Sequence, residues 1–410
     1  MRTPLLTFAA ALLGIALLAG CQSSPTIDIQ RAQTPMEYSR DVPAITPQDW
    51  AIRGTVLSST DQASFDMSQF PAGSSVKTFV YQSISGITGA PTVVGGAVLT
   101  PPGTPPPGGW PVIGYAHFTT GVMSDCGTLE DPQLAGNLPG VDALLDQGYA
   151  VAYTDYAGLG KAATDGGADE VHPYLEPKSE AFNLIDAVRA ARSLDPALSN
   201  RWVAYGGSQG GQAAWAAAEY FPTYGEGTEL LGAVTLAPAL DVSGLADLAE
   251  NSELTTDQRN IYPLVITGLA AVDPEINPDD YFGGDLRRGL GAVVACRGPN
   301  ADHHDEVIDA ADRSDLKRPS PDATARLLRR LESYSLPQRP TITPLLAIYG
   351  GTDSLVLPEW TTAAIERACA IGDNVTEVLI PEQGHSVEAG PTDDRWIADR
   401  FAGLPANGTC

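Results

Sequence analysis

Short apolar runs alternate with stretches of helical spacing along most of this chain of 410 residues. The apolar runs are rich in Val, Ile, Leu, Ala and aromatic residues, which is typical of strands buried on both faces of a sheet. Between them, residues 179–193 place apolar side chains on one face of a helix. Because strands alternate with helices, the pattern predicts an α/β fold, doubly wound around a mostly parallel central sheet. We predict strands at residues 76–81, 92–99, 110–115, 149–153, 201–205, 230–236, 344–349 and 375–380, and further helices at residues 212–220, 360–370 and 393–401.

This alternation is interrupted once, in residues 241–339. The segment has helical stretches at residues 242–254 and 322–334 and few strand signals. We therefore expect a mostly helical cap or lid here, inserted between two parts of an α/β core that comprise residues 47–240 and 340–410.

The N-terminus carries the pattern of an export signal. Arg2 supplies a positive charge, and residues 5–18 form an apolar stretch that is short for a permanent membrane span. It ends in Leu-Ala-Gly-Cys, which resembles a bacterial lipobox, so residues 1–20 are interpreted as a lipoprotein signal peptide. Cys21 would then be lipidated and anchor the chain to a membrane. The alternative is an ordinary cleaved signal with an incidental cysteine, and both interpretations predict export. Residues 21–46, rich in Ser, Pro, Thr and Gln, are expected to form a flexible tether that holds an extracytoplasmic domain.

Composition and charge restrict the class of partner. Hydrophobic residues make up 43% of the chain and charged residues 18%, which indicates a globular protein. The net charge of −26 argues against nucleic acid as a partner, because phosphates require a basic surface. We expect a monomer that needs no metal or organic cofactor. His303 and His304, flanked by Asp302 and Asp305, are interpreted as a solvated charged face rather than a metal site.

An exported protein can form disulfides, and four cysteines remain besides Cys21: Cys126, Cys296, Cys369 and Cys410. They allow three pairings, which the sequence alone does not separate. We favour Cys126–Cys296, which would tie a loop beside the expected active site to the inserted segment. The other bridge, Cys369–Cys410, would then fix the C-terminal tail.

The candidate nucleophile is Ser208, in the sequence Gly206-Gly207-Ser208-Gln209-Gly210. A predicted strand runs into this motif and an Ala-rich, helix-favouring stretch leaves it, which is the context of a nucleophile elbow. The serine in such an elbow has a strained backbone, and side chains two positions away on either side would collide. Gly206 and Gly210 remove that collision.

A serine hydroxyl needs a base to take its proton and an acid to orient the base. The chain has only five histidines, at positions 117, 172, 303, 304 and 385. In α/β-hydrolases the order along the chain is serine, acid, histidine, and only His385, in a loop after a predicted strand, satisfies that order in the right setting. The alternative is a surface-loop histidine. Asp353, in the loop that follows the strand at residues 344–349, is the candidate acid, and the alternative for it is a simple turn residue.

An oxyanion hole requires two backbone N–H donors. Gln209, directly after the nucleophile, is expected to supply one. The other is expected from the loop that follows the strand at residues 110–115, and we favour Thr119 over Phe118.

Several of these motifs together resemble the secretory lipase family of α/β-hydrolases, which includes the yeast lipase A type and many exported actinobacterial proteins. The resemblance spans residues 76–385. It implies hydrolysis of carboxylic esters, often acylglycerols, beneath a helical cap, and it lends support to the Cys126–Cys296 bridge. The chain departs from the family at Phe118, where such loops commonly have glycine. The motifs are the elbow at residues 206–211, the loops at residues 115–121 and 155–160, His172-Pro173-Tyr174, and the turn at residues 349–353.

The resulting expectation is an exported, envelope-anchored serine ester hydrolase, a lipase or esterase, that acts on a small-molecule or lipid ester through an acyl-enzyme. Three alternatives stay open. A serine peptidase or an acyltransferase would use the same residues, and product analysis would separate them. A non-catalytic envelope-binding lipoprotein would tolerate loss of Ser208.

Overall fold

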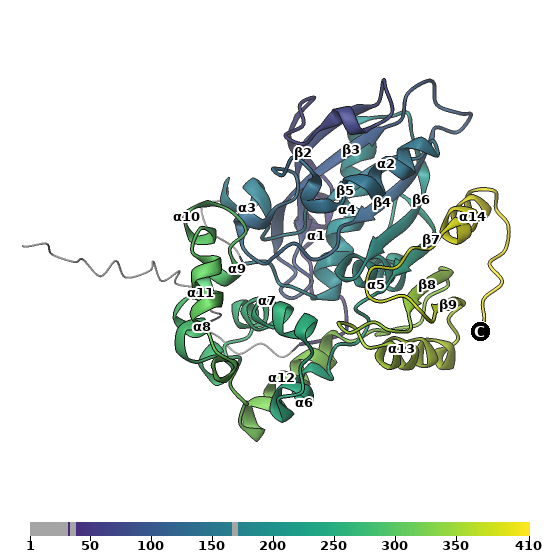
Figure 1. Cartoon of the computed structure of the whole chain (residues 1–410). Helices are drawn as coiled ribbons and strands as arrows, with labels where there is room; N and C mark the ends of the chain where they lie inside the picture. The colour runs from purple at the N-terminus through teal and green to yellow at the C-terminus, as the bar shows by residue number, and fades with distance from the viewer. Residues whose placement is uncertain (1–31, 33–37, 166–170) are drawn as a thin grey trace, which may run out of the picture.

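The computed structural model describes residue 32, residues 38–165 and residues 171–410. Within these residues the chain forms a nine-stranded sheet with the order β1-β2-β3-β5-β4-β6-β7-β8-β9 (Figure 1). The strands β1, β2, β3 and β5 pair antiparallel in that order, and all neighbours from β5 to β9 run parallel. The predicted α/β fold with a mostly parallel sheet is therefore confirmed. The strands are β1 (Val56–Thr60), β2 (Ser75–Ile84), β3 (Pro91–Thr100), β4 (Trp110–Ala116), β5 (Ala150–Thr154), β6 (Leu198–Gly207), β7 (Glu229–Leu236), β8 (Leu345–Gly350) and β9 (Val375–Ile380).

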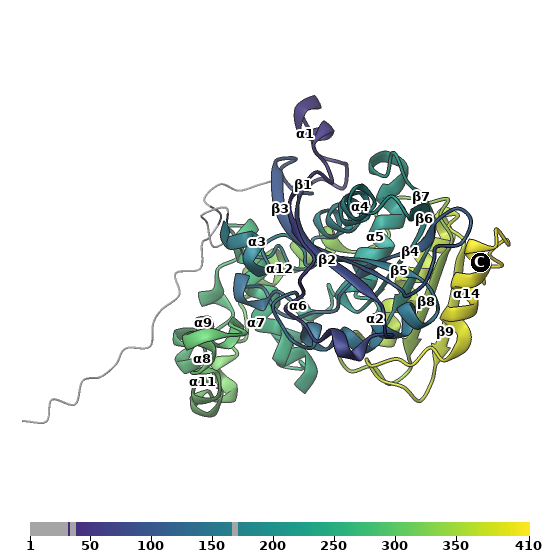
Figure 2. The ribbon, with the colours of Figure 1, turned by 90° about the horizontal axis from the view of Figure 1, so that it is seen from above.

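Helices cover both faces of the sheet, which explains why the parallel strands read as nearly continuous apolar runs. Successive residues of a strand point to opposite faces, so β6 places Trp202 and Ala204 in one hydrophobic cluster and Val203 in the other. The first cluster includes residues of α4 (Pro177–Leu194) and α5 (Gln209–Tyr224), and the second includes residues of α2 (Leu138–Asp146) and α14 (Pro391–Phe401). Figure 2 shows α4 and α5 on one side of the central strands and α2 on the other.

The segment between β7 and β8 is helical, and in Figure 1 its green helices gather to one side of the sheet. Its longest helix, α7, was not among the predicted elements. A capping box begins α7: the Thr255 side chain accepts from the Gln258 backbone, and the Gln258 side chain reaches back to the Thr255 backbone. The sequence Thr-x-x-Gln at residues 255–258 could therefore have predicted the start of this helix. The helices are α6 (Leu245–Asn251), α7 (Thr256–Val272), α8 (Gly284–Arg288), α9 (Leu290–Val294), α10 (Gly298–Ala301), α11 (His304–Ala310) and α12 (Pro321–Tyr334).

The remaining helices are α1 (Pro47–Ala51), α3 (Gly160–Asp165) and α13 (Pro358–Ile371). The expected signal peptide, Cys21 and most of the expected tether lie outside the described residues. In the part of the chain that the structure describes, no helix is both long enough and apolar enough to cross a membrane.

Both favoured disulfides are present in the structure. Cys126 and Cys296 are bonded with their Cα atoms 5.0 Å apart, which joins the loop after β4 to the segment after α9. Cys369 of α13 is bonded to Cys410 with a Cα–Cα distance of 5.6 Å, and this bond holds the C-terminal tail against the core.

Candidate active site

Ser208 lies at the sharp turn between β6 and α5. Its backbone has φ 55° and ψ −117°, a conformation that non-glycine residues rarely adopt. The turn is tightly packed: a Cβ at Gly206 would approach the Gly210 carbonyl oxygen to 2.3 Å, and a Cβ at Gly210 would approach the Ala116 carbonyl oxygen to 2.0 Å. The Ser208 N–H donates to the Leu236 carbonyl at 2.8 Å. Glycine is therefore required at both positions, and neighbouring strands fix the turn.

Loops at the ends of three parallel strands bring Ser208, His385 and Asp353 together. The Ser208 hydroxyl lies 2.8 Å from His385 Nε2, and His385 Nδ1 lies 2.7 Å from Asp353 Oδ2. A carboxylate only accepts, so Nδ1–H donates to Asp353 and Nε2 is left to accept from the serine. Asp353 has a side chain that is only 2% exposed, whereas the His385 side chain is 24% exposed. The buried carboxylate can thus orient a base that still reaches the site.

The Asp353 carboxylate is itself held by the backbone. Asp353 Oδ1 accepts from the N–H groups of Leu355 at 2.8 Å and Val356 at 3.0 Å. The loop that carries His385 packs closely on the end of β8, because a Cβ at Gly350 would come within 2.3 Å of the Gly384 carbonyl oxygen. The positions of Asp353 and His385 are therefore fixed relative to each other.

Three residues near Ser208 carry backbone N–H groups that are candidates for an oxyanion hole: Gln209 follows it in the chain, and Phe118 and Thr119 line the same cavity. Gln209 is the first residue of α5, and Phe118 and Thr119 follow β4. Within the described residues, the N–H groups of these three residues have no hydrogen-bond acceptor. The Thr119 hydroxyl is engaged with the Tyr174 hydroxyl at 2.7 Å, so its backbone N–H is the donor left for a ligand. Free N–H groups at a helix start attract negative charge.

A cavity of about 890 Å³ opens at Ser208 and His385. The helix α7 forms one wall through Ile261 and Leu264, and its polar residues Asp257 and Asn260 lie at the same cavity. This space can hold a substrate with an apolar chain attached to a more polar part. The other lining residues are Phe118, Thr119, Gly207, Leu236, Ser354, Leu355, Gly384, Ser386 and Val387.

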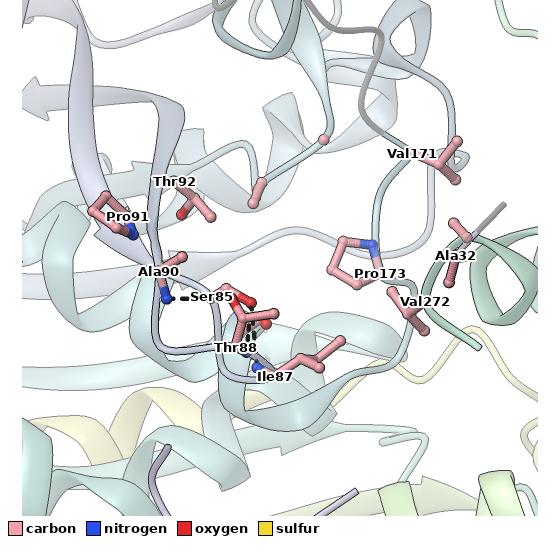
Figure 3. Close-up of a pocket in the computed structure, with 14 residues that line it drawn as sticks. Ala32, Ser85, Ile87, Thr88, Ala90, Pro91, Thr92, Val171, Pro173 and Val272 are labelled. Atoms are coloured by element: carbon pink, nitrogen blue, oxygen red, sulfur yellow. Dashed lines mark hydrogen bonds between the residues drawn. The ribbon is translucent and has the colours of Figure 1, made fainter. Parts of the chain in front are cut away.

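A second cavity, of about 460 Å³, lies elsewhere, and neither Ser208 nor His385 lines it (Figure 3). The turn between β2 and β3 contributes Ile87 and Ala90, and the end of α7 contributes Val272. Figure 3 shows Val171 and Pro173 across from that turn.

The other histidines have different positions. His117 is fully buried, and its Nδ1 donates to the Phe118 carbonyl at 2.6 Å. His172 is also buried, and burial lowers the pKa of each of these imidazoles to about 4. Both are therefore neutral at pH 7. His303 and His304 are partly exposed and pair with neighbouring carboxylates of α11.

Sequence reasoning missed a buried polar group behind the serine, formed by His172, Glu180 and the Gln209 side chain. The Gln209 amide nitrogen lies 2.6 Å from His172 Nε2 and 2.8 Å from Glu180 Oε1. Glu180 lies at the start of the helix predicted for residues 179–193, and a carboxyl group beside its apolar face was the available signal.

Comparisons with known proteins find similarity to lipases and esterases. Residues 133–280 match the model of the family described as secretory lipase, which confirms the resemblance over that part of the chain. The structure is similar to Candida antarctica lipase A in its closed state, with a TM-score of 0.67, 16% identity, and coverage of 89% of this chain and 87% of that chain. It is also similar to the rice cell wall degrading esterase LipA from Xanthomonas oryzae, with a TM-score of 0.63, 22% identity, and coverage of 85% and 98%. At these identities the structural likeness establishes the shared fold. No curated protein matches the sequence.

Proposed function

We propose that this protein is an exported serine carboxylic ester hydrolase, a lipase or esterase. The observation that carries the proposal is the hydrogen-bonded chain from Ser208 through His385 to the buried Asp353. The match to the secretory lipase family and the structural similarity to a lipase and an esterase support the same reaction class.

In the proposed reaction His385 Nε2 takes the proton of the Ser208 hydroxyl, and the oxygen attacks the ester carbonyl carbon. Asp353 accepts from Nδ1–H throughout and stabilises the imidazolium. The tetrahedral oxyanion receives hydrogen bonds from the N–H groups of Gln209 and Thr119. His385 then gives its proton to the leaving alkoxide, so the alcohol departs and an acyl-serine remains. Water repeats the sequence and releases the acid.

The cavity supports a substrate with an apolar chain. Leu236, Ile261 and Leu264 offer apolar surface next to the reactive hydroxyl, which favours an acyl chain or an apolar alcohol. The chemistry requires neither a metal nor an organic cofactor. We further propose that residues 241–339 act as a cap over this cavity, and that the chain is exported and anchored through lipidated Cys21 as a monomer.

The test is hydrolysis of p-nitrophenyl esters from acetate to palmitate by wild type and Ser208→Ala. We expect kcat to fall by about 10⁴-fold or more in the variant, because the nucleophile is lost. Equal rates in both proteins would refute the proposal. Anilide substrates and added alcohol acceptors are included, since faster amide cleavage or a dominant transfer product would indicate a peptidase or an acyltransferase instead.

A further inference from the structure

The side chain of Gln209, the residue that follows the nucleophile, is fully buried and polar. Its amide nitrogen makes two contacts, with Glu180 Oε1 at 2.8 Å and with His172 Nε2 at 2.6 Å. Glu180 and His172 are also buried, with exposed fractions of 0% and 1%. The residue proposed to stabilise the oxyanion is therefore anchored from behind by two side chains of another segment.

The direction of these hydrogen bonds follows from the partners. His172 Nδ1 lies 2.8 Å from the Ala157 carbonyl oxygen, which can only accept, so Nδ1 carries the proton. His172 Nε2 is then an acceptor, and one N–H of the Gln209 amide donates to it. The second N–H donates to Glu180 Oε1, which also accepts from the Leu175 backbone N–H at 3.0 Å. Both amide hydrogens are used, and the side chain has one orientation.

The same segment contacts the other side of the oxyanion hole. Tyr174, two residues after His172, bonds its hydroxyl to Thr119 Oγ1 at 2.7 Å. The segment is itself closely packed, because a Cβ at Gly268 of α7 would lie 2.7 Å from Tyr174 Cβ. The His172 N–H also donates to the Val122 carbonyl at 2.8 Å.

We propose that residues 172–180 form a single support that positions both N–H donors of the oxyanion hole, through His172 and Glu180 on one side and Tyr174 on the other. The proposal rests on the proposed function. These three are positioning residues: they act on the Gln209 and Thr119 side chains and touch no reacting atom.

A purely structural role explains this arrangement less well. Gln209 Oε1 and Glu180 Oε2 are buried without a partner in the described residues, which costs stability. Apolar side chains of similar volume would pack here without that cost. A rigid hydrogen-bonded support is useful, however, where donors must hold their positions as charge develops on the substrate oxygen.

The test compares Gln209→Met with the control Glu219→Met. Glu219 also lies on α5, is 1% exposed, and accepts from the Trp215 side chain and from the backbone N–H groups of Gln338 and Arg339, so its replacement is a buried polar-to-apolar change away from residues 172–180. Each protein is assayed for ester hydrolysis and for inhibition by a trifluoromethyl ketone. The Ser208 oxygen attacks the carbonyl carbon of this ketone, and the carbonyl oxygen becomes the oxyanion of a hemiketal. The matching methyl ketone serves as a ground-state probe.

In Gln209→Met we expect kcat/KM to fall and the trifluoromethyl ketone inhibition constant to rise by the same factor, about 10–100-fold, with the methyl ketone unaffected. Glu219→Met is expected to keep kcat/KM and both inhibition constants. Equal effects in the two variants, or an unchanged trifluoromethyl ketone constant in Gln209→Met, would overturn the proposal.

Tyr174→Phe removes a single oxygen and keeps the proposal testable if Gln209→Met does not fold. We expect a parallel change of about 3–10-fold in the same two quantities, and unchanged values would contradict the support through Thr119. Wild type and Ser208→Ala are run alongside. If Ser208→Ala is inactive but Gln209→Met keeps wild-type kcat/KM and inhibition constants, this inference alone is overturned. If Ser208→Ala stays active, the proposed function is overturned.

Discussion

The hydrogen bonds around Asp353 predict a large effect of a single-atom change, Asp353→Asn. Asp353 Oδ1 accepts from two backbone N–H groups, those of Leu355 and Val356, at 2.8 Å and 3.0 Å. The asparagine oxygen must take this place, since an NH₂ group there would face two donors. The NH₂ group is then directed at His385 Nδ1, which has to become an acceptor. His385 Nε2 would carry the proton and could no longer accept one from Ser208.

The expected magnitude follows from this tautomer change. The same substitution in a serine protease triad lowers kcat by about 10⁴-fold. Each tenfold change corresponds to about 1.4 kcal/mol of activation free energy, so the expected loss here is about 5 kcal/mol. The assay is the pre-steady-state and steady-state release of p-nitrophenol from a short-chain ester at pH 7. Thermal unfolding confirms that the variant is folded.

Asp373→Asn is the matched control. Asp373 is also buried, at 2% exposure, and accepts from the backbone N–H of Thr341 at 2.7 Å, but it lies outside the residues that line the Ser208 cavity. We expect wild-type kcat from this control. If folded Asp353→Asn stays within tenfold of wild type, the tautomer argument, and with it the assigned role of Asp353, is wrong.

Three further predictions concern the stability of the fold. Gly210→Ala should prevent folding and so abolish activity in the soluble fraction, because its Cβ would lie 2.0 Å from the Ala116 carbonyl oxygen. Gly207→Ala should fold, because the nearest atom to its Cβ is 3.8 Å away. Equal melting temperatures of the two variants would contradict this prediction. Burial raises the pKa of Glu219 to about 8, so the native state keeps a proton that the unfolded state releases above pH 4.5. The free energy of unfolding of the wild type should therefore fall between pH 5 and 8. Glu219→Gln should lose less stability over that range in urea titrations, and an equal loss would show that Glu219 does not titrate in this way. Replacing both Cys369 and Cys410 with serine should lower unfolding stability by up to roughly 4 kcal/mol and leave kcat unchanged, which calorimetry and the ester assay measure together.

The candidate site shows where sequence reasoning works and where it ends. Gly206 and Gly210 could be predicted from the sequence, because the clash they avoid involves the backbone of residues close in the chain and of the adjacent strand β4. Ser208, Asp353 and His385 were predicted from their order after predicted strands, and the structure brings their side chains within hydrogen-bond distance, since parallel strands bring the loops at their carboxyl ends to one edge. The antiparallel strand β1 was not predicted, because its residues Val56–Thr60 are mostly polar and exposed and carry little apolar signal.

The sequence by itself determined the alternation of strands and helices, the helical segment inserted between β7 and β8, and the glycines of the turn at Ser208. These features could be predicted because periodicity and steric restrictions act over a few neighbouring residues. The tertiary structure decided which distant groups meet. His172 lies 37 residues from Gln209, and Tyr174 lies 55 residues from Thr119, yet both contacts are direct. The same holds for the cysteine pairs, of which the sequence allowed three arrangements. Such contacts depend on strand order and on how the connecting loops and helices pack against one another, and local side-chain patterns do not encode either.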